Sequence, residues 1–257
     1  MSVIVIGDRA VGKTHMALTL AKKDEGLRVK IVDPSYKALR EELQSIDTGE
    51  MVPTREMIKR EVKLEVELNH RKIIKSFWVD TPGDCWETEW QEKNEDDWND
   101  LKQEIGQNTG IILLLPPYQE IVSKLLLKKA SPVMTLDREQ LMNSEKWCNN
   151  LEDWLKFFNK HCSRVDNIAI CLHKADLFCQ SLDDEARTMQ GHPVERQRQV
   201  RNRYFAVAKE VINRNNREVR PFQFFVTSIS DRTLLEAPWL YLSRFIQDLR
   251  STAIYGT

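Results

Sequence analysis

The chain has 257 residues, which is enough to bury a full hydrophobic core. With 41% hydrophobic and 30% charged residues it has the composition of a soluble globular protein, and no apolar stretch reaches the length of a transmembrane helix. Its net charge of −1 argues against nucleic-acid binding through bulk charge. The five cysteines are odd in number and lack Cys-x-x-Cys spacing, so we expect reduced thiols and a cytoplasmic protein. Because the first residues already favour a strand, we expect no signal peptide.

The chain opens with the apolar residues 3–6, which favour a strand and run into Gly7-Asp8-Arg9-Ala10-Val11-Gly12-Lys13-Thr14. An Ala- and Leu-rich helical pattern at 16–21 follows. Strand, Gly-x-x-x-x-Gly-Lys-Thr and helix in this order are typical of a phosphate-binding loop. The alternative is a plain glycine turn between a core strand and a helix. We call residues 7–14 the phosphate loop.

The chemistry of this loop follows from its residue types. The glycines let successive backbone N–H groups point at phosphate oxygens, and the start of the helix adds positive potential at the same place. Lys13 is expected to reach the β- and γ-phosphates, and the Thr14 hydroxyl is expected to bind Mg²⁺. The loop therefore predicts a site for a nucleotide and a magnesium ion.

The remaining pattern alternates strands and helices. Residues 62–68 alternate apolar with charged side chains and precede an apolar run at 73–79, which predicts a hairpin. Further strands are expected at 27–32, 111–115, 168–172 and 222–226. Helices are expected at 36–46, 121–129, 138–159, 194–213 and 239–249. We therefore predict a single α/β domain over residues 1–257 with a mostly parallel sheet, and with the excess length in connections near 27–50, 117–160 and 180–220.

Three further motifs stand at the ends of expected strands. An aspartate at Asp80 can hold Mg²⁺ through water, and the N–H of Gly83 can bond a γ-phosphate. In His173-Lys174-Ala175-Asp176, the base loop, a carboxylate can accept hydrogen bonds from guanine N1 and N2, a donor pair that adenine lacks. The backbone of Thr227-Ser228-Ile229 is expected to meet guanine O6.

Taken together, these motifs resemble those of the Ras-like small GTPases, and the phosphate loop is especially similar to the Rho type. The segment 43–54 is similar to bacterial members that carry an extra strand and helix before the first switch. The resemblance implies a P-loop NTPase fold of the Ras-like kind, with one antiparallel strand and helices on both faces. It also implies a molecular switch that binds GTP and GDP with Mg²⁺ and hydrolyses GTP.

The same family supplies a first-switch threonine whose hydroxyl binds Mg²⁺. By resemblance we assign this role to Thr54, with Thr48 as the second choice; Pro53-Thr54 can also be only a turn.

Three residues depart from the family pattern. Asp84 replaces the usual glutamine that orients the attacking water, which makes it a poor base or a residue without a catalytic role, so we expect slow intrinsic hydrolysis. Arg9 stands where relatives have a small residue; it can act as a built-in cation, block a partner's arginine, or point to solvent. His173 replaces an Asn or Thr that links the base loop to the phosphate loop, and its imidazole can still donate one hydrogen bond.

Two charged segments suggest partner surfaces. Residues 84–100 carry eight acidic residues and one lysine, and include Trp86, Trp90 and Trp98. These tryptophans can anchor a nucleotide-dependent effector or activating protein, or they can pack inward below an acidic loop. Residues 194–220 have eight basic and three acidic residues, which suits nucleic acid, an anionic membrane surface or an acidic protein, although a solvated helix face is the favoured interpretation.

The sequence thus leaves more than one function open. A GTP-hydrolysing switch is the leading hypothesis. Asp84 and Arg9 favour a GTP-binding scaffold with little turnover as the alternative. A P-loop kinase is a weaker third, because it leaves the base loop unexplained and lacks an Arg-rich lid before Asp80.

Overall fold

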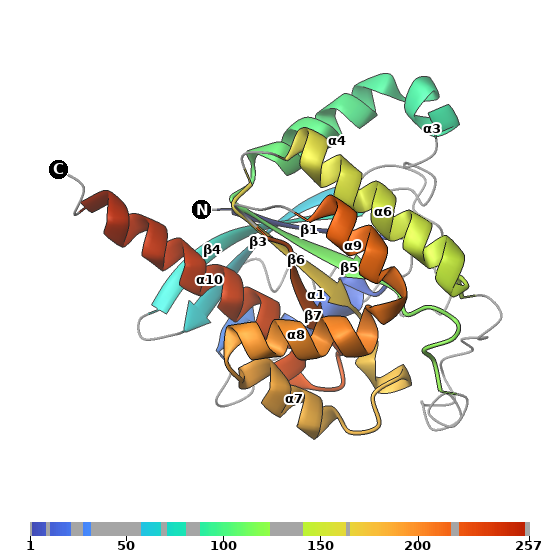
Figure 1. Ribbon diagram of the computed structural model, residues 1–257. Helices are drawn as coiled ribbons and strands as arrows, with labels where there is room; N and C mark the ends of the chain where they lie inside the picture. The colour runs from blue at the N-terminus through green and yellow to red at the C-terminus, as the bar shows by residue number, and fades with distance from the viewer. Residues whose placement is uncertain are drawn as a thin grey trace, which may run out of the picture.

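Apolar runs of the sequence form the centre of a seven-stranded sheet with the order β2-β3-β4-β1-β5-β6-β7 (Figure 1). The computed structural model describes residues 2–8, 11–21, 28–31, 58–67, 71–80, 88–123, 141–162, 165–216 and 221–254. Every residue of β5 and β6 is buried, as expected for strands covered on both faces.

The sheet is mostly parallel. Strand β1 (Ser2–Gly7) lies between β4 (Arg71–Asp80) and β5 (Gly110–Leu115) and is parallel to both. The parallel series continues from β5 to two further strands, β6 (Asn167–Leu172) and β7 (Gln223–Val226). This confirms the predicted α/β class with a mostly parallel sheet.

One strand runs against the others. Strand β3 (Ile58–Glu67) pairs antiparallel with β4 and with the edge strand β2 (Val29–Ile31). In β3, the buried Val62, Leu64 and Val66 alternate with charged residues, so its sequence pattern sets which face is buried. The predicted hairpin is confirmed, and among the described strands β3 is the one that runs antiparallel to its neighbours, as expected.

Helices cover the two faces of the sheet. In Figure 1, α4 (Glu95–Gln107), α6 (Ser144–His161) and α9 (Lys209–Asn215) lie on one side, and α1 (Lys13–Ala21) with α10 (Arg232–Ile254) lies on the other. The remaining elements are short or lie near β7: α3 (Thr88–Lys93), α7 (Leu182–Gln190), α8 (Pro193–Tyr204), and the 3-10 turns η2 (Ala175–Leu177) and η3 (Ala206–Ala208). Within the described residues, no helix combines the length and apolar character needed to cross a bilayer.

Four helix predictions need correction. The helix predicted at 239–249 is longer and spans Arg232–Ile254 as α10. Residues 121–123 are not helical, and the predicted helix 36–46 and residues 124–129 lie outside the described part. Helix α6 begins only at 144, because the Asn143 side chain caps it by accepting from the N–H of Lys146 at 2.9 Å. The predicted helix 194–213 is two helices separated by η3, where the ring of Phe205 turns into the core against Phe224, 4.9 Å between centroids.

A buried ion pair on α10 fixes α1 and the edge strand β2. Glu236 is 5% exposed; its carboxylate accepts from Arg232 Nε at 2.8 Å and from the backbone N–H groups of Arg28 and Val29 at 3.3 Å each. The Arg232 guanidinium donates in addition to three backbone carbonyl oxygens, those of Thr19, Leu20 and Val29. The pair therefore satisfies backbone groups at the end of α1 and at the sheet edge, which secondary structure leaves open.

The substitution Glu236→Ala is expected to lower the free energy of unfolding by about 3 kcal/mol, because it removes the counter-ion of the Arg232 guanidinium and leaves two backbone N–H groups without their acceptor. Urea denaturation measures the loss. Glu89→Ala is the matched control: it removes an i,i+4 partner from Lys93, but those side chains are 77% and 69% exposed, so the loss should stay below about 0.5 kcal/mol. Equal losses in the two variants would contradict the role given to Glu236.

Candidate functional site

The carboxyl ends of the parallel strands share one edge of the sheet, which is where open α/β sheets bind ligands. Backbone hydrogen bonds join the loops that leave this edge. The N–H of Thr227 donates to Leu172 O, and the N–H of Ala175 donates to Thr227 O, each at 3.0 Å. The N–H of His173 donates to Leu115 O at 2.9 Å. The loops after β5, β6 and β7 therefore form one connected surface.

The phosphate loop begins where β1 meets β5. Gly7 has φ +153°, and a Cβ atom there would lie 2.2 Å from the carbonyl oxygen of Leu114. Gly12 has φ +109°, and a Cβ atom there would lie 3.1 Å from the ring of His173. Both positions therefore require glycine for two reasons: a side chain disfavours the backbone conformation, and a neighbouring strand or loop approaches closely.

Lys13 is folded back over this loop. It is the first residue of α1 and is 6% exposed, and its Nζ donates to the carbonyl oxygens of Gly7 at 2.8 Å and Asp8 at 3.1 Å. Val11 is buried beside it, and its N–H lies 3.5 Å from Asp8 O. A held ammonium, a glycine turn and a helix N-terminus thus lie together, an arrangement whose charge suits an anion.

Asp8 points its side chain toward α6. Its Oδ2 accepts from Asn150 Nδ2 at 2.6 Å and its Oδ1 accepts from Trp154 Nε1 at 3.3 Å. Burial raises the pKa of Asp8, while these two hydrogen bonds and the charge of Lys13 oppose that rise. Asn150 and Trp154 were not predicted from the sequence, because no local pattern connects residues more than 140 positions apart with the phosphate loop.

His173 links the phosphate loop with the loop after β7. Its ring packs against Gly12, and its Nδ1 shares a hydrogen bond with Thr227 Oγ1 at 2.9 Å. The side chain is 2% exposed, and burial, followed by the charges of Lys174 and His15, lowers the pKa of His173 to about 3. The imidazole is therefore neutral near pH 7, and it bridges two of the predicted motifs.

Asp176 and Ser228 also meet. The Ser228 hydroxyl donates to Asp176 Oδ1 and accepts from the N–H of Ser230 at 3.1 Å. Lys174 lies in the left-handed region with φ +63°, and burial lowers the pKa of its ammonium while Asp176 opposes that change. Ile229 is 38% exposed in the adjoining turn. The base loop and residues 227–229 are thus brought together from two strands.

The remaining predicted site residues have a partial description or none. Asp80 ends β4; since Val5 pairs with Trp78, Asp80 and Gly7 each lie two residues beyond that pair, at the same sheet edge. Thr14 is the second residue of α1, and only the backbone of Thr14 and Asp80 is described. Arg9, Ala10, Thr54, Gly83 and Asp84 lie outside the described residues. Among the described residues, no cluster of three or more His, Cys, Asp or Glu is arranged to hold a metal ion.

In the acidic segment 84–100, Trp98 packs inward. Its ring lies 5.6 Å from that of Phe157 on α6, and the Lys102 ammonium lies 5.6 Å from its centroid. Of the two alternatives for the tryptophans of this segment, packing inward and anchoring a partner, Trp98 follows the first. Trp90 is partly exposed, and Trp86 lies outside the described residues.

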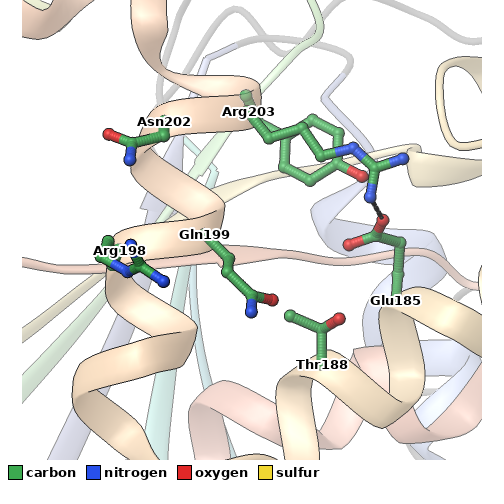
Figure 2. A pocket seen from close by; sticks show the side chains of 7 residues that line it. Glu185, Thr188, Arg198, Gln199, Asn202 and Arg203 are labelled. Atoms are coloured by element: carbon green, nitrogen blue, oxygen red, sulfur yellow. Dashed lines mark hydrogen bonds and ion pairs between the residues drawn. The ribbon is translucent and has the colours of Figure 1, made fainter.

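Much of the basic charge in 194–220 is used within the chain. Arg196 is buried over the Phe225 ring at 4.9 Å, and Arg198 pairs with Glu195 at 2.8 Å. Figure 2 shows Arg203 reaching across from α8 to the buried Glu185 of α7, beside a pocket of about 400 Å³. The pocket is lined by Glu185, Thr188, Arg198, Gln199, Asn202, Arg203 and Tyr204. These contacts reduce the charge that α8 offers to a partner.

Comparisons with protein-family models and with curated proteins found no match to this chain.

The neutral state of His173 makes stability depend on pH. The folded-state pKa of His173, about 3, lies below the usual 6.5. The neutral imidazole therefore contributes its full stabilisation of the folded state above pH 6.5, and this stabilisation is lost as the pH falls toward 3. Between pH 7 and pH 5 this residue should cost about 2 kcal/mol of stability, a loss that His173→Asn should not show. Urea denaturation at both pH values tests this, with the exposed His192→Asn as control, which should keep the wild-type pH dependence. An unchanged dependence in His173→Asn would contradict the prediction.

Proposed function

We propose that this chain is a guanine-nucleotide-binding molecular switch that hydrolyses GTP to GDP and phosphate. The observation that carries the proposal is the contact of His173 with both Gly12 and Thr227, because it joins the phosphate loop to the two loops expected to hold the base. These three motifs are far apart in the sequence and lie at the carboxyl ends of the parallel strands, the edge at which open α/β sheets generally bind ligands. A mostly parallel sheet with one antiparallel strand supports the finer assignment to the Ras-like P-loop NTPases.

In this proposal the phosphate loop binds the triphosphate. On binding, the glycines Gly7 and Gly12 let backbone N–H groups of the loop turn toward the phosphates, and the Lys13 ammonium moves from the loop carbonyls to the β- and γ-phosphate oxygens. Thr14, Thr54 and Asp80 would hold Mg²⁺, as expected from the sequence. Mg²⁺, when bound, neutralises charge on the phosphates.

The base loop selects guanine. Asp176 accepts from guanine N1 and N2, and Ser228 holds one of its oxygens and so orients the carboxylate. Each carboxylate oxygen has two acceptor positions, so Oδ1 can bind Ser228 and the base together. Ile229 directly follows Ser228, so its backbone can contact guanine O6 while Asp176 binds N1 and N2 of the same base.

Hydrolysis in this proposal is slow without a partner. Asp84 follows Gly83 where a glutamine would orient the attacking water, and an aspartate beside the γ-phosphate only accepts hydrogen bonds. Arg9 supplies a compensating cation or interferes with one from a partner. The alternative function is a GTP-binding scaffold with little turnover; single-turnover hydrolysis by the wild-type chain distinguishes the two, since a scaffold would leave bound GTP intact over hours.

Lys13→Ala should weaken GTP binding by at least about 100-fold, because no other described cation lies at the loop carbonyls and charge-assisted bonds to phosphate are strong. Equilibrium binding of a fluorescent GTP analogue measures the loss, and thermal melting confirms that the variant is folded. Wild-type affinity in a folded Lys13→Ala variant would mean that the phosphate loop is not the binding site.

Asp176→Asn should weaken the binding of GTP by about 100-fold or more and strengthen the binding of xanthosine triphosphate. The amide oxygen can keep the bond from Ser228, which turns the NH₂ group outward, where it can donate to the 2-oxo group of xanthine. Competition binding with GTP, ATP and xanthosine triphosphate tests the change. A wild-type chain that binds ATP as well as GTP would overturn the guanine assignment.

A further inference from the structure

One residue of the phosphate loop is fixed from two sides. The carbonyl oxygen of Asp8 accepts from Lys13 Nζ at 3.1 Å, and both carboxylate oxygens of Asp8 accept from α6, from Asn150 at 2.6 Å and Trp154 at 3.3 Å. Asn150 and Trp154 are one helical turn apart, so they present their donors on the same face of α6.

The hydrogen bonds from α6 to the Asp8 carboxylate affect the electrostatics of the phosphate loop. A carboxylate in a loop that binds a polyanion would repel the phosphates, and it would compete with them for the Lys13 ammonium. The two donors from α6 are neutral, so they hold the carboxylate away from the loop interior without adding a competing charge. Burial between the loop and α6 makes the loss of either donor costly, because an ionised carboxylate needs its hydrogen bonds.

We infer that Asn150 and Trp154 are positioning residues for the phosphate loop, which act by holding the Asp8 carboxylate on α6 and away from the phosphates. The inference rests on the proposed function, since it names two residues that set the affinity of the same site. Neither residue needs to touch the nucleotide. When a donor is lost, Asp8 turns toward Lys13 and the bound phosphates, and the affinity for GTP and GDP falls.

Helix α6 provides a matched pair of tryptophans for the test. Trp147 and Trp154 are 0% and 1% exposed, and each donates its indole N–H to one acceptor, Trp147 to Pro116 O at 2.8 Å and Trp154 to Asp8. Trp147→Phe and Trp154→Phe remove the same donor from the same helix. Only Trp154→Phe removes a hydrogen bond to the phosphate loop.

The experiment measures GTP, GDP and GMP affinities together with thermal stability. Trp154→Phe should weaken GTP and GDP by about tenfold and GMP much less, whereas Trp147→Phe should change stability but not affinity. Asn150→Ala should act as Trp154→Phe does, with the exposed neighbour Asn149→Ala as its control, so the test survives if one variant does not fold.

A double-mutant cycle tests whether the effect passes through Asp8. In an Asp8→Ala background, Trp154→Phe should have no further effect on GTP affinity, because there is no carboxylate left to hold. A tenfold loss that persists in this background, or equal affinities of Trp147→Phe and Trp154→Phe, would overturn the inference while leaving nucleotide binding in place. A wild-type chain that binds no guanine nucleotide would overturn the proposed function, and the inference with it.

Discussion

The close approach of Gly7 to the carbonyl of Leu114 is the constraint on which the candidate site depends. Any side chain at position 7 would force β1 and β5 apart or displace the phosphate loop, since a Cβ atom there lies 2.2 Å from a backbone oxygen. The carbonyl of Gly7 then receives the Lys13 ammonium, and the far end of the loop, at Gly12, receives the ring of His173. The phosphate loop therefore contacts β5 at one end and the base loop at the other, with the Lys13 ammonium on the carbonyl between them.

Helix α6 covers the sheet and also contacts the phosphate loop and α4. One face of it donates to Asp8 through Asn150 and Trp154, and further along Phe157 packs on Trp98 of α4. The same helix is thus in contact with the loop that we propose binds phosphate and with the acidic segment that follows β4.

Local patterns predicted the strands well for a physical reason. Alternation in Val62, Leu64 and Val66 and the continuous apolar run of β5 report burial directly, and burial sets the strand and its face. Helix boundaries were less predictable. The start of α6 depends on the Asn143 cap, and the break after α8 depends on Phe205 entering the core beside Phe224. Helix α7 is strongly polar and was not predicted, although the Ser181 side chain caps its start by accepting from the N–H of Asp184.

The sequence alone predicted the α/β class, the strand that precedes the phosphate loop, and the residues that we propose bind a phosphate and a base. It did so because glycine, lysine and carboxylate positions are encoded over a few neighbouring residues. Three other features follow from tertiary contacts: Asp8 faces α6, His173 is neutral between Gly12 and Thr227, and Arg196 is buried on Phe225 instead of contributing to a basic surface. These outcomes depend on which distant elements bring a donor, a ring or a low-polarity surface to each side chain, and contacts between residues tens to more than one hundred positions apart leave no local pattern to read.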